Sequence, residues 1–403
     1  MFKKIVLFIF SVLLMASCGG IELEERTGSG SELKIKPVVT TEDSNFPGKS
    51  NSAKVEMICI DFPEVIYDSI VLGEDVEDIT VEKKVFPYKL AKYELSYNVW
   101  RIVYKWATSE ERGSRIYTFE NAGAEGAYGA YILFNEGGDP QSVGMPVTGI
   151  SWRDAVVWCN AFSEMCELEP VYYTDSGFSS PIRNAVHTDG ADIKNCPLPY
   201  SSLAKEVDMN SLTKGKIDNP YVNKLSNGWR LPYDYEWEYA ARKCKDGSFL
   251  SGRNVPGDPN GPAYGSAAPS LLDQIKGITE AIPSSKKSGD YAWNKNNSAG
   301  NGTNPTDAGW DDSTPISGMS GIRMHKQGGK LPTGLGFYDM GGNAYEWQFD
   351  YGAAYNWKYE LYPSRALRGY TYQWPITDNF AAAARYICPP YVKMGGIRLA
   401  RNF

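Results

Sequence analysis

Cysteine and histidine, the residue types that most often carry nucleophilic or metal chemistry, are few and widely spaced in this chain. There are seven cysteines and two histidines, and the cysteines form no repeated C-x-x-C pair of the kind used by zinc ribbons and thioredoxins. The histidines, His187 and His325, lie far apart in the sequence. A histidine-rich metal site or a Ser-His-Asp triad is therefore poorly supported.

Disulfide chemistry is left open by the sequence. Cys159 and Cys166 fall in one expected helix, about two turns or roughly 10 Å apart along its axis, which is too far for a disulfide without unwinding. An oxidising compartment would permit bridges among the six cysteines that follow Cys18, but the sequence does not choose a pairing.

Three segments have the periodicity or end signals of helices, and they position the motifs described below. Residues 96–107 carry apolar side chains at helical spacing, and residues 153–168 follow Ser151 as N-cap with Asp154 in the first turn. Pro232 opens a third helix that continues to Arg242. Residues 85–94 alternate as a strand, whereas residues 243–335 are rich in Gly, Pro, Asn and Ser and predict long loops.

Six motifs follow one another along the chain in a fixed order: Lys92–Tyr97, Pro146–Cys159, Arg230–Arg242, Gly336–Trp347, Leu367–Tyr372 and Gly396–Arg401. In this order they resemble the signature of the formylglycine-generating-enzyme (sulfatase-modifying-factor) family, and the resemblance covers roughly residues 54–403. It implies one α+β domain of the C-type-lectin-like class, with much irregular loop and two main helices.

The resemblance does not extend to the catalytic cysteines. The catalysing branch of the family binds copper through two cysteines shortly after the fifth motif, and copper prefers such soft thiolates. Here residues 370–380 contain no cysteine, and Cys388 is the one nearby. We therefore expect no copper, no formylglycine synthesis and no enzymatic activity; the alternative is an enzyme or maturation factor of the cell envelope that uses this fold.

The family resemblance also implies a structural calcium ion at the turn of the fourth motif. Asn343 and Glu346 keep the residue types that supply oxygen ligands there. The alternative is that Asn343 holds the turn while Glu346 pairs with an arginine.

The last fifty residues resemble, more narrowly, the variable proteins of bacterial diversity-generating retroelements, and in particular the Treponema variable protein, a lipoprotein of this fold. In such systems the C-terminal codons are rewritten and the altered side chains bind varied ligands. We therefore predict that one exposed, ligand-binding surface is formed with Trp374 as its partly buried floor and the following side chains around it: Tyr370, Tyr372, Tyr386, Ile387, Cys388 and Tyr391. Ordinary drift in a non-catalytic family member is the alternative.

The N-terminus predicts export and lipid anchoring. Lys3 and Lys4 precede a short apolar run that ends at Leu14, and small residues then lead to Cys18. This arrangement resembles a lipoprotein box with Cys18 as the lipid attachment site; the alternative is an ordinary signal peptide with an incidental cysteine. The sequence thus predicts a signal peptide at 1–17, a flexible tether at 18–53 and one folded domain at 54–403.

Composition limits the partners. An apolar content of 42% supports a real core, and a net charge of −7 argues against nucleic acid. The expected protein is a surface-displayed lipoprotein of the cell envelope, at the outer membrane or cell surface, which binds a protein or glycan ligand.

Overall fold

The computed structural model describes residues 35–44, 54–76, 80–128, 132–186, 212–262, 288–298, 322–355 and 361–403. The predicted signal peptide, Cys18, His187 and Cys196 lie outside these ranges. Inter-residue contacts divide the chain into two units, Met1–Lys34 and Ile35–Phe403, and everything below concerns the second unit. None of the helices in the described ranges has the length and apolar character needed to cross a membrane.

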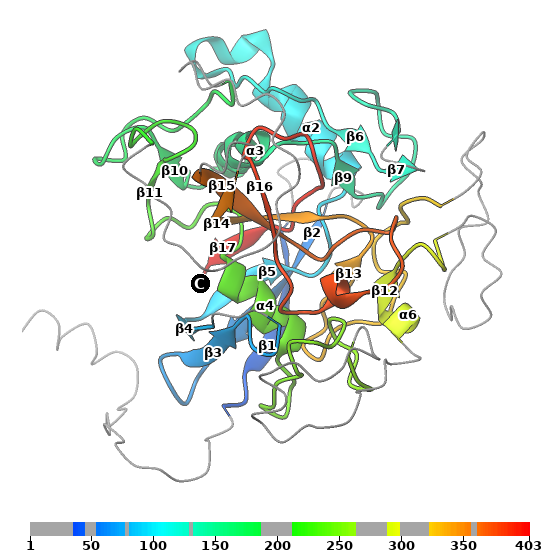
Figure 1. The fold of residues 1–403 in the computed structure, drawn as a ribbon. Helices are drawn as coiled ribbons and strands as arrows, with labels where there is room; N and C mark the ends of the chain where they lie inside the picture. The colour runs from blue at the N-terminus through cyan, green and yellow to red at the C-terminus, as the bar shows by residue number, and fades with distance from the viewer. Residues whose placement is uncertain are drawn as a thin grey trace, which may run out of the picture. The chain divides into compact units, whose positions relative to one another are not determined.

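A four-stranded antiparallel sheet joins the beginning and the end of this unit (Figure 1). Its order is β1 (Val38–Ser44), β2 (Val55–Asp61), β5 (Tyr88–Ala91) and β17 (Ala400–Asn402). β1 pairs with β2 along its whole length, from Val38 opposite Asp61 to Ser44 opposite Val55. The predicted boundary at residue 53 is therefore wrong, because seven residues assigned to the tether add a strand to the sheet.

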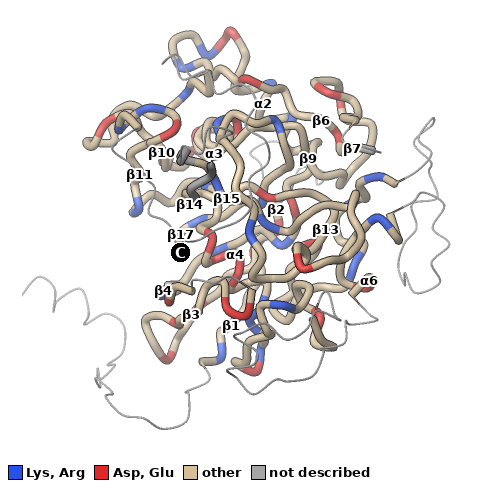
Figure 2. Tube along the Cα trace, in the orientation of Figure 1, with Lys and Arg blue, Asp and Glu red and all other residues tan. Residues whose placement is uncertain are grey.

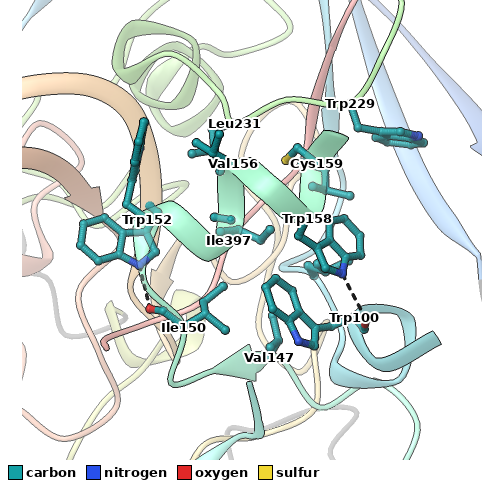
Figure 3. Close-up of a cluster of buried hydrophobic side chains, with 14 of the residues drawn as sticks. Trp100, Val147, Ile150, Trp152, Val156, Trp158, Cys159, Trp229, Leu231 and Ile397 are labelled. Atoms are coloured by element: carbon teal, nitrogen blue, oxygen red, sulfur yellow. Dashed lines mark hydrogen bonds between the residues drawn. The ribbon is translucent and has the colours of Figure 1, made fainter. Parts of the chain in front are cut away.

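Two helices begin within the first and second motifs and pack against each other. They are α2 (Tyr97–Ala107) and α3 (Trp152–Met165), close to the predicted ranges. The Ser151 hydroxyl accepts from the Asp154 backbone N–H, and the Asp154 carboxylate accepts from the Ser151 N–H, so a capping box begins α3. Trp100 and Trp158 stack between the helices with ring centroids 5.4 Å apart, and Trp158 donates to the Trp100 carbonyl (Figure 3).

The third predicted helix is α4 (Asp234–Arg242), which packs against β3 (Asp68–Leu72), β4 (Val81–Val85) and β14 (Glu346–Tyr355). The strand predicted at 85–94 is divided between the end of β4 and β5, which belong to different sheets. β14, β15 (Leu361–Arg368) and β16 (Tyr386–Cys388) form a three-stranded antiparallel sheet in that order.

The remaining elements are short, as the Gly- and Pro-rich loops predict. They are η2 (Glu110–Arg115), β6 (Ala124–Glu125), β7 (Ala127–Tyr128), β8 (Ile132–Leu133), β9 (Val147–Thr148), β10 (Tyr172–Tyr173), β11 (Tyr221–Val222), α6 (Ser288–Tyr291), β12 (Ala292–Trp293), β13 (Gly341–Gly342) and η4 (Asp378–Phe380). A few helices with many short, separately paired strands confirm the predicted α+β class.

Candidate functional site

The candidate site is the segment between β15 and β17, residues 369–399. It leaves β15 through a tight turn in which Gly369 and Tyr370 both adopt left-handed backbone conformations, with φ of 86° and 66°. It returns to the sheet in β16, where Tyr386 pairs with Leu367. Tyr370 tolerates a conformation that favours glycine because its ring is held on several sides by other rings.

Those rings form what we call the tyrosine cluster: Tyr345, Tyr370, Phe380 and Tyr386. The Tyr370 ring lies 5.5 Å from Tyr345, 4.9 Å from Phe380 and 5.0 Å from Tyr386. Edge-to-face and tilted contacts at these distances are the favourable arrangements of aromatic pairs. Asn379 also donates its side-chain amide to the Tyr370 hydroxyl at 3.3 Å.

The predicted exposed surface is wrong for four of its members. Tyr370 is 7% exposed and lies inside the tyrosine cluster, and Tyr372 is fully buried against Trp293 in a separate core. Ile387 and Cys388 are each 1% exposed. Because these four side chains are buried, they cannot contact a ligand directly.

The other three predicted side chains have access to solvent. Trp374 is 48% exposed, so it is not the partly buried floor that was predicted. Tyr386 and Tyr391 are half-buried, and the Tyr391 ring lies 5.6 Å from the Arg153 guanidinium at the start of α3. The structure therefore brings Tyr386 to the tyrosine cluster with Tyr370, and places Tyr391 beside α3.

Strand geometry explains part of this error. Successive side chains of a strand point to opposite faces, so Ile387 faces inward where its neighbour Tyr386 reaches the surface. The alternation of Tyr386 and Ile387 carried this signal in the sequence. The left-handed turn that directs Tyr370 inward has no comparable signal, because glycine is not the residue there.

A buried ion-pair network, which sequence reasoning missed, holds the segment to α4. Arg368 at the end of β15 bonds to Asp234 at 2.5 Å and to Glu238 at 2.8 Å, and it also donates to the carbonyl of Ala384. Glu238 in turn pairs with Arg242 at 2.8 Å. All four charged side chains are at most 3% exposed.

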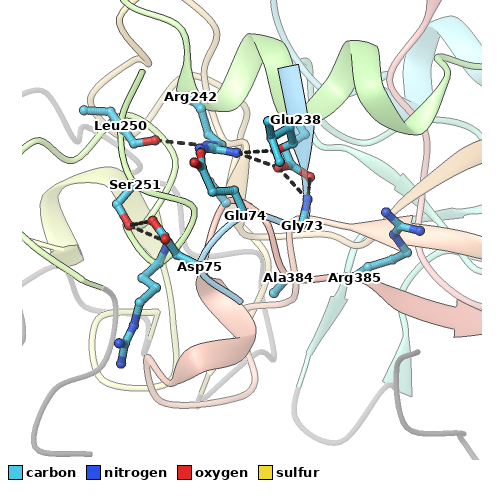
Figure 4. Close-up of polar contacts among 12 residues, drawn as sticks. Gly73, Glu74, Asp75, Glu238, Arg242, Leu250, Ser251, Ala384 and Arg385 are labelled. Carbon is cyan, nitrogen blue, oxygen red and sulfur yellow. Dashed lines mark hydrogen bonds and ion pairs between the residues drawn. The ribbon is translucent and has the colours of Figure 1, made fainter. Parts of the chain in front are cut away.

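The network continues to the turn after β3 (Figure 4). Arg242 pairs with Glu74 at 2.5 Å, and the Glu238 carboxylate accepts from the backbone N–H of Gly73. Arg385, on the candidate segment, forms an ion pair with Asp234 at 2.7 Å. Because each buried charge lies beside an opposite charge, these ion pairs hold the segment on both sides of the tyrosine cluster.

At the turn of the fourth motif, the structure favours the second interpretation of Asn343 and Glu346. Asn343 has a left-handed conformation with φ of 54°, and its side chain bonds to Glu94 and to the backbone of His325. Glu346 is fully buried, pairs with Arg398 at 2.6 Å and accepts from Trp237 at 2.6 Å. No group of three or more metal-ligating side chains was found among the described residues, so calcium stays an untested prediction there.

Several carboxyls near these networks ionise with difficulty. Burial raises the pKa of Asp339 to about 6, and burial together with the neighbouring Asp234 raises the pKa of Asp350 to about 6. Burial, with Asp339 and Glu346 nearby, also raises the pKa of Glu94 well above its ordinary value.

Burial works against nucleophilic reactivity in two of the cysteines that the structure describes. Cys388 is buried in β16, and burial raises the pKa of Cys159 well above its usual range and that of Cys166 to about 11. A reactive cysteine needs a lowered pKa, which these positions do not supply.

Comparison with known proteins places this geometry in a family. A curated relative, the chaperone protein LppX of Paenibacillus barcinonensis, is 25% identical over 209 residues, which make up 51% of this chain and 52% of that protein. This chain thus matches about half the length of that relative. Residues 77–403 match the sulfatase-modifying factor enzyme 1-like domain family.

Solved structures with similar folds share few identical residues with this chain. CarF matches with a TM-score of 0.49 and 20% identity, covering 87% of this chain and 98% of CarF. Treponema denticola variable protein 1 matches with a TM-score of 0.49 and 19% identity, covering 90% and 99%. PvdO from Pseudomonas aeruginosa matches with a TM-score of 0.41 and 14% identity, covering 87% and 95%. With most of its length matched by the domain, the chain belongs to the sulfatase-modifying factor enzyme 1-like domain family.

Proposed function

We propose that this protein is an exported lipoprotein, anchored through Cys18, that binds a protein or glycan ligand with its C-terminal surface and catalyses no reaction. One observation carries the proposal: aromatic and apolar packing occupies the segment in which the catalysing branch of the family keeps its cysteine pair. Residues 370–380 contain no cysteine, and Cys388 is buried. A single buried thiol cannot take the place of a pair of thiolate ligands.

The proposed contact residues are those of the segment that reach solvent. Trp374, Tyr386 and Tyr391 supply aromatic area with few rotatable bonds, and Asn379 and Lys393 supply polar contacts. The buried rings Tyr345, Tyr370 and Phe380 and the Arg368 network beneath them would hold the backbone while surface side chains change. A rigid support of this kind suits a surface whose codons are rewritten.

Sequencing tests the variable-protein part of this proposal. The last hundred or so nucleotides of the gene would be sequenced deeply from one growing culture and compared with the rest of the gene. We expect substitutions concentrated at the first two positions of the codons for solvent-reaching residues such as Tyr386 and Tyr391. Uniform, rare substitutions along the whole gene would contradict it.

Binding is tested with protein and glycan arrays. Wild-type protein should bind at least one ligand class, and Tyr391→Ala should weaken that binding about thirtyfold, as loss of an interface anchor worth about 2 kcal/mol does. Lys245→Ala, which removes an exposed cation after α4, is the matched control and should bind as wild type does. Equal binding by Tyr391→Ala and wild type would exclude Tyr391 as an anchor.

A second candidate, a maturation factor of the cell envelope, is favoured by the relative named as a chaperone. It predicts that the protein raises the yield of an active, co-expressed envelope enzyme. Incubation with copper, oxygen and a sulfatase-motif peptide separates the two candidates from a catalytic role: both predict that mass spectrometry finds the peptide cysteine unchanged.

A further inference from the structure

A cleft of about 850 Å³ is lined by residues of η2 and of the C-terminal ends of α2 and α3. This volume falls within the range of about 300–1,000 Å³ that small-molecule sites occupy. Four side chains give it an apolar lining, and charged side chains stand around them. The apolar residues are Ile102, Trp106, Met165 and Leu168.

This cleft is separate from the C-terminal surface. The candidate segment contacts the first turn of α3, where the Arg153 N–H donates to the Pro390 carbonyl. The cleft is lined by Glu164 and Met165 at the other end of the same helix. A helix of this length separates its ends by about 20 Å, so the two places do not overlap.

The charges in the cleft favour an anion although the whole chain is acidic. Lys105, Arg112 and Arg115 face it, against Glu111 and Glu164. Figure 2 shows basic and acidic residues interspersed over the body in that view.

One of the two carboxylates is already neutralised. Glu164 pairs with Arg112 at 2.6 Å and also with Arg183. Next to this pair, the Tyr117 hydroxyl lies beside the Glu164 carboxylate. Tyr117 is 2% exposed.

Two rim cations are available to a ligand. Arg115 is exposed and has no acidic partner in the part of the chain that the structure describes. Lys105 pairs with Asp139, which is fully exposed, and such surface pairs hold their partners weakly. The Arg112 guanidinium lies 3.6 Å from the Trp106 ring, so this arginine is held flat over the apolar floor.

From these features we propose that the cleft binds an acidic oligosaccharide, one that carries sulfate or carboxylate groups. The apolar floor suits the ring faces of sugars, and the cations suit the acidic groups. The rim also offers the acceptor Glu111 and the hydroxyl of Ser109, which suit sugar hydroxyls and which a simple anion would leave unused. The proposal does not depend on the function assigned to the C-terminal surface.

Isothermal titration calorimetry at low salt tests it with three probes: a heparin-derived tetrasaccharide, an oligogalacturonate trimer and the neutral cellotriose. We expect the sulfated probe, the carboxylated probe or both to bind and cellotriose not to bind. Whichever acidic probe binds identifies the acidic group. Absence of binding by both acidic probes, or equal binding of the neutral one, would overturn the proposal.

Variants locate the site. Arg115→Ala should weaken binding at least about tenfold, as loss of a charge-assisted hydrogen bond does, and should leave folding unchanged because the side chain is exposed. Glu111→Gln removes a like charge from the rim and should tighten binding. Lys245→Ala is the control for a general loss of positive charge. If Tyr391→Ala abolishes binding and Arg115→Ala binds as wild type does, the ligand binds at the C-terminal surface. That result would overturn the proposal.

Discussion

The two halves of the interior are built by different chemistry. Between α2 and α3 the core is aromatic and aliphatic: Trp100 stacks on Trp158, and Phe162 stacks on Trp229 at 4.6 Å. Between α4 and β15 the core contains charges, with Arg368 fully buried between Asp234 and Glu238. The first half positions a helix pair, and the second positions the C-terminal segment.

The difference has consequences for specificity. Apolar packing tolerates moderate changes in shape, because neighbouring side chains adjust at a modest cost. A buried ion pair tolerates removal of neither partner, because the remaining charge is left without solvent or counter-charge. The candidate surface is thus supported by the charged core between α4 and β15, which tolerates few substitutions. The cleft is supported by the apolar core between α2 and α3.

Removing an aromatic ring from the apolar half should have the largest effect. Trp158→Ala is expected to lower the free energy of unfolding by about 4 kcal/mol, because it leaves a large cavity beside Trp100. Urea denaturation followed by circular dichroism measures this. Trp158→Phe, which keeps a ring in place, should cost clearly less; an equal loss in both would assign the effect to the lost hydrogen bond to Trp100.

Breaking the polar half with almost no change in volume should cost slightly less. Glu238→Gln leaves Arg368 and Arg242 each with one carboxylate fewer, and we expect a loss of about 3 kcal/mol. Lys54→Ala is the matched control: it breaks an exposed pair with Asp43 and should change stability by less than about 0.5 kcal/mol. A Glu238→Gln protein as stable as the control would show that the network contributes nothing.

The same contrast explains what the sequence could predict. Helical periodicity located α2 and α3, because their apolar side chains repeat at helical spacing, and Ser151 caps the start of α3. Ordered motifs predicted the fold class and the family. Hydrophobic periodicity cannot predict that Arg368 is buried, because an arginine is usually a surface residue. Its partners Asp234 and Glu238 are far from it in the sequence, and only the fold brings them together.

The residues of the candidate surface were predicted from their position in the sequence, which does not show which side chains are exposed. Sequence position placed Tyr370, Tyr372 and Tyr386 in one segment, but it could not show which rings turn inward. A single left-handed residue decides this for Tyr370, and a hydrogen bond from the Tyr372 N–H to the Asn343 carbonyl helps to fix the chain at Tyr372. Such tertiary contacts are absent from local sequence patterns.

Within the tyrosine cluster, two tyrosines should behave differently when truncated. Tyr370→Ala should lower stability by about 2 kcal/mol, because the ring is buried among three others, whereas Tyr386→Ala should cost about 1 kcal/mol, because part of that ring already faces solvent. Chemical denaturation of both variants measures the difference. Equal losses would show that Tyr386 belongs to the core and would remove it from the proposed contact surface.

The smallest expected effect concerns Asp350, at the edge of the polar half. Its carboxylate accepts from the Asp234 N–H at 2.6 Å, and burial beside the Asp234 carboxylate raises its pKa to about 6. A pKa raised on folding means that the folded state binds the proton more tightly, so this stabilisation is complete below the unfolded pKa of about 4 and is lost as pH rises through about 6.

Asp350→Asn keeps an acceptor oxygen without the charge, and it should therefore be more stable than wild type by about 1 kcal/mol at pH 7 and equal to it near pH 4. Thermal unfolding between pH 4 and 8 measures both, with Asp175→Asn as control, since the exposed Asp175 carboxyl has a lowered pKa and its loss should not stabilise the protein at any pH. An Asp350→Asn protein less stable than wild type at pH 7 would contradict this prediction. It would mean that the ionised Asp350 carboxylate stabilises Arg385, so that Asp350 belongs to the ion-pair network between α4 and β15.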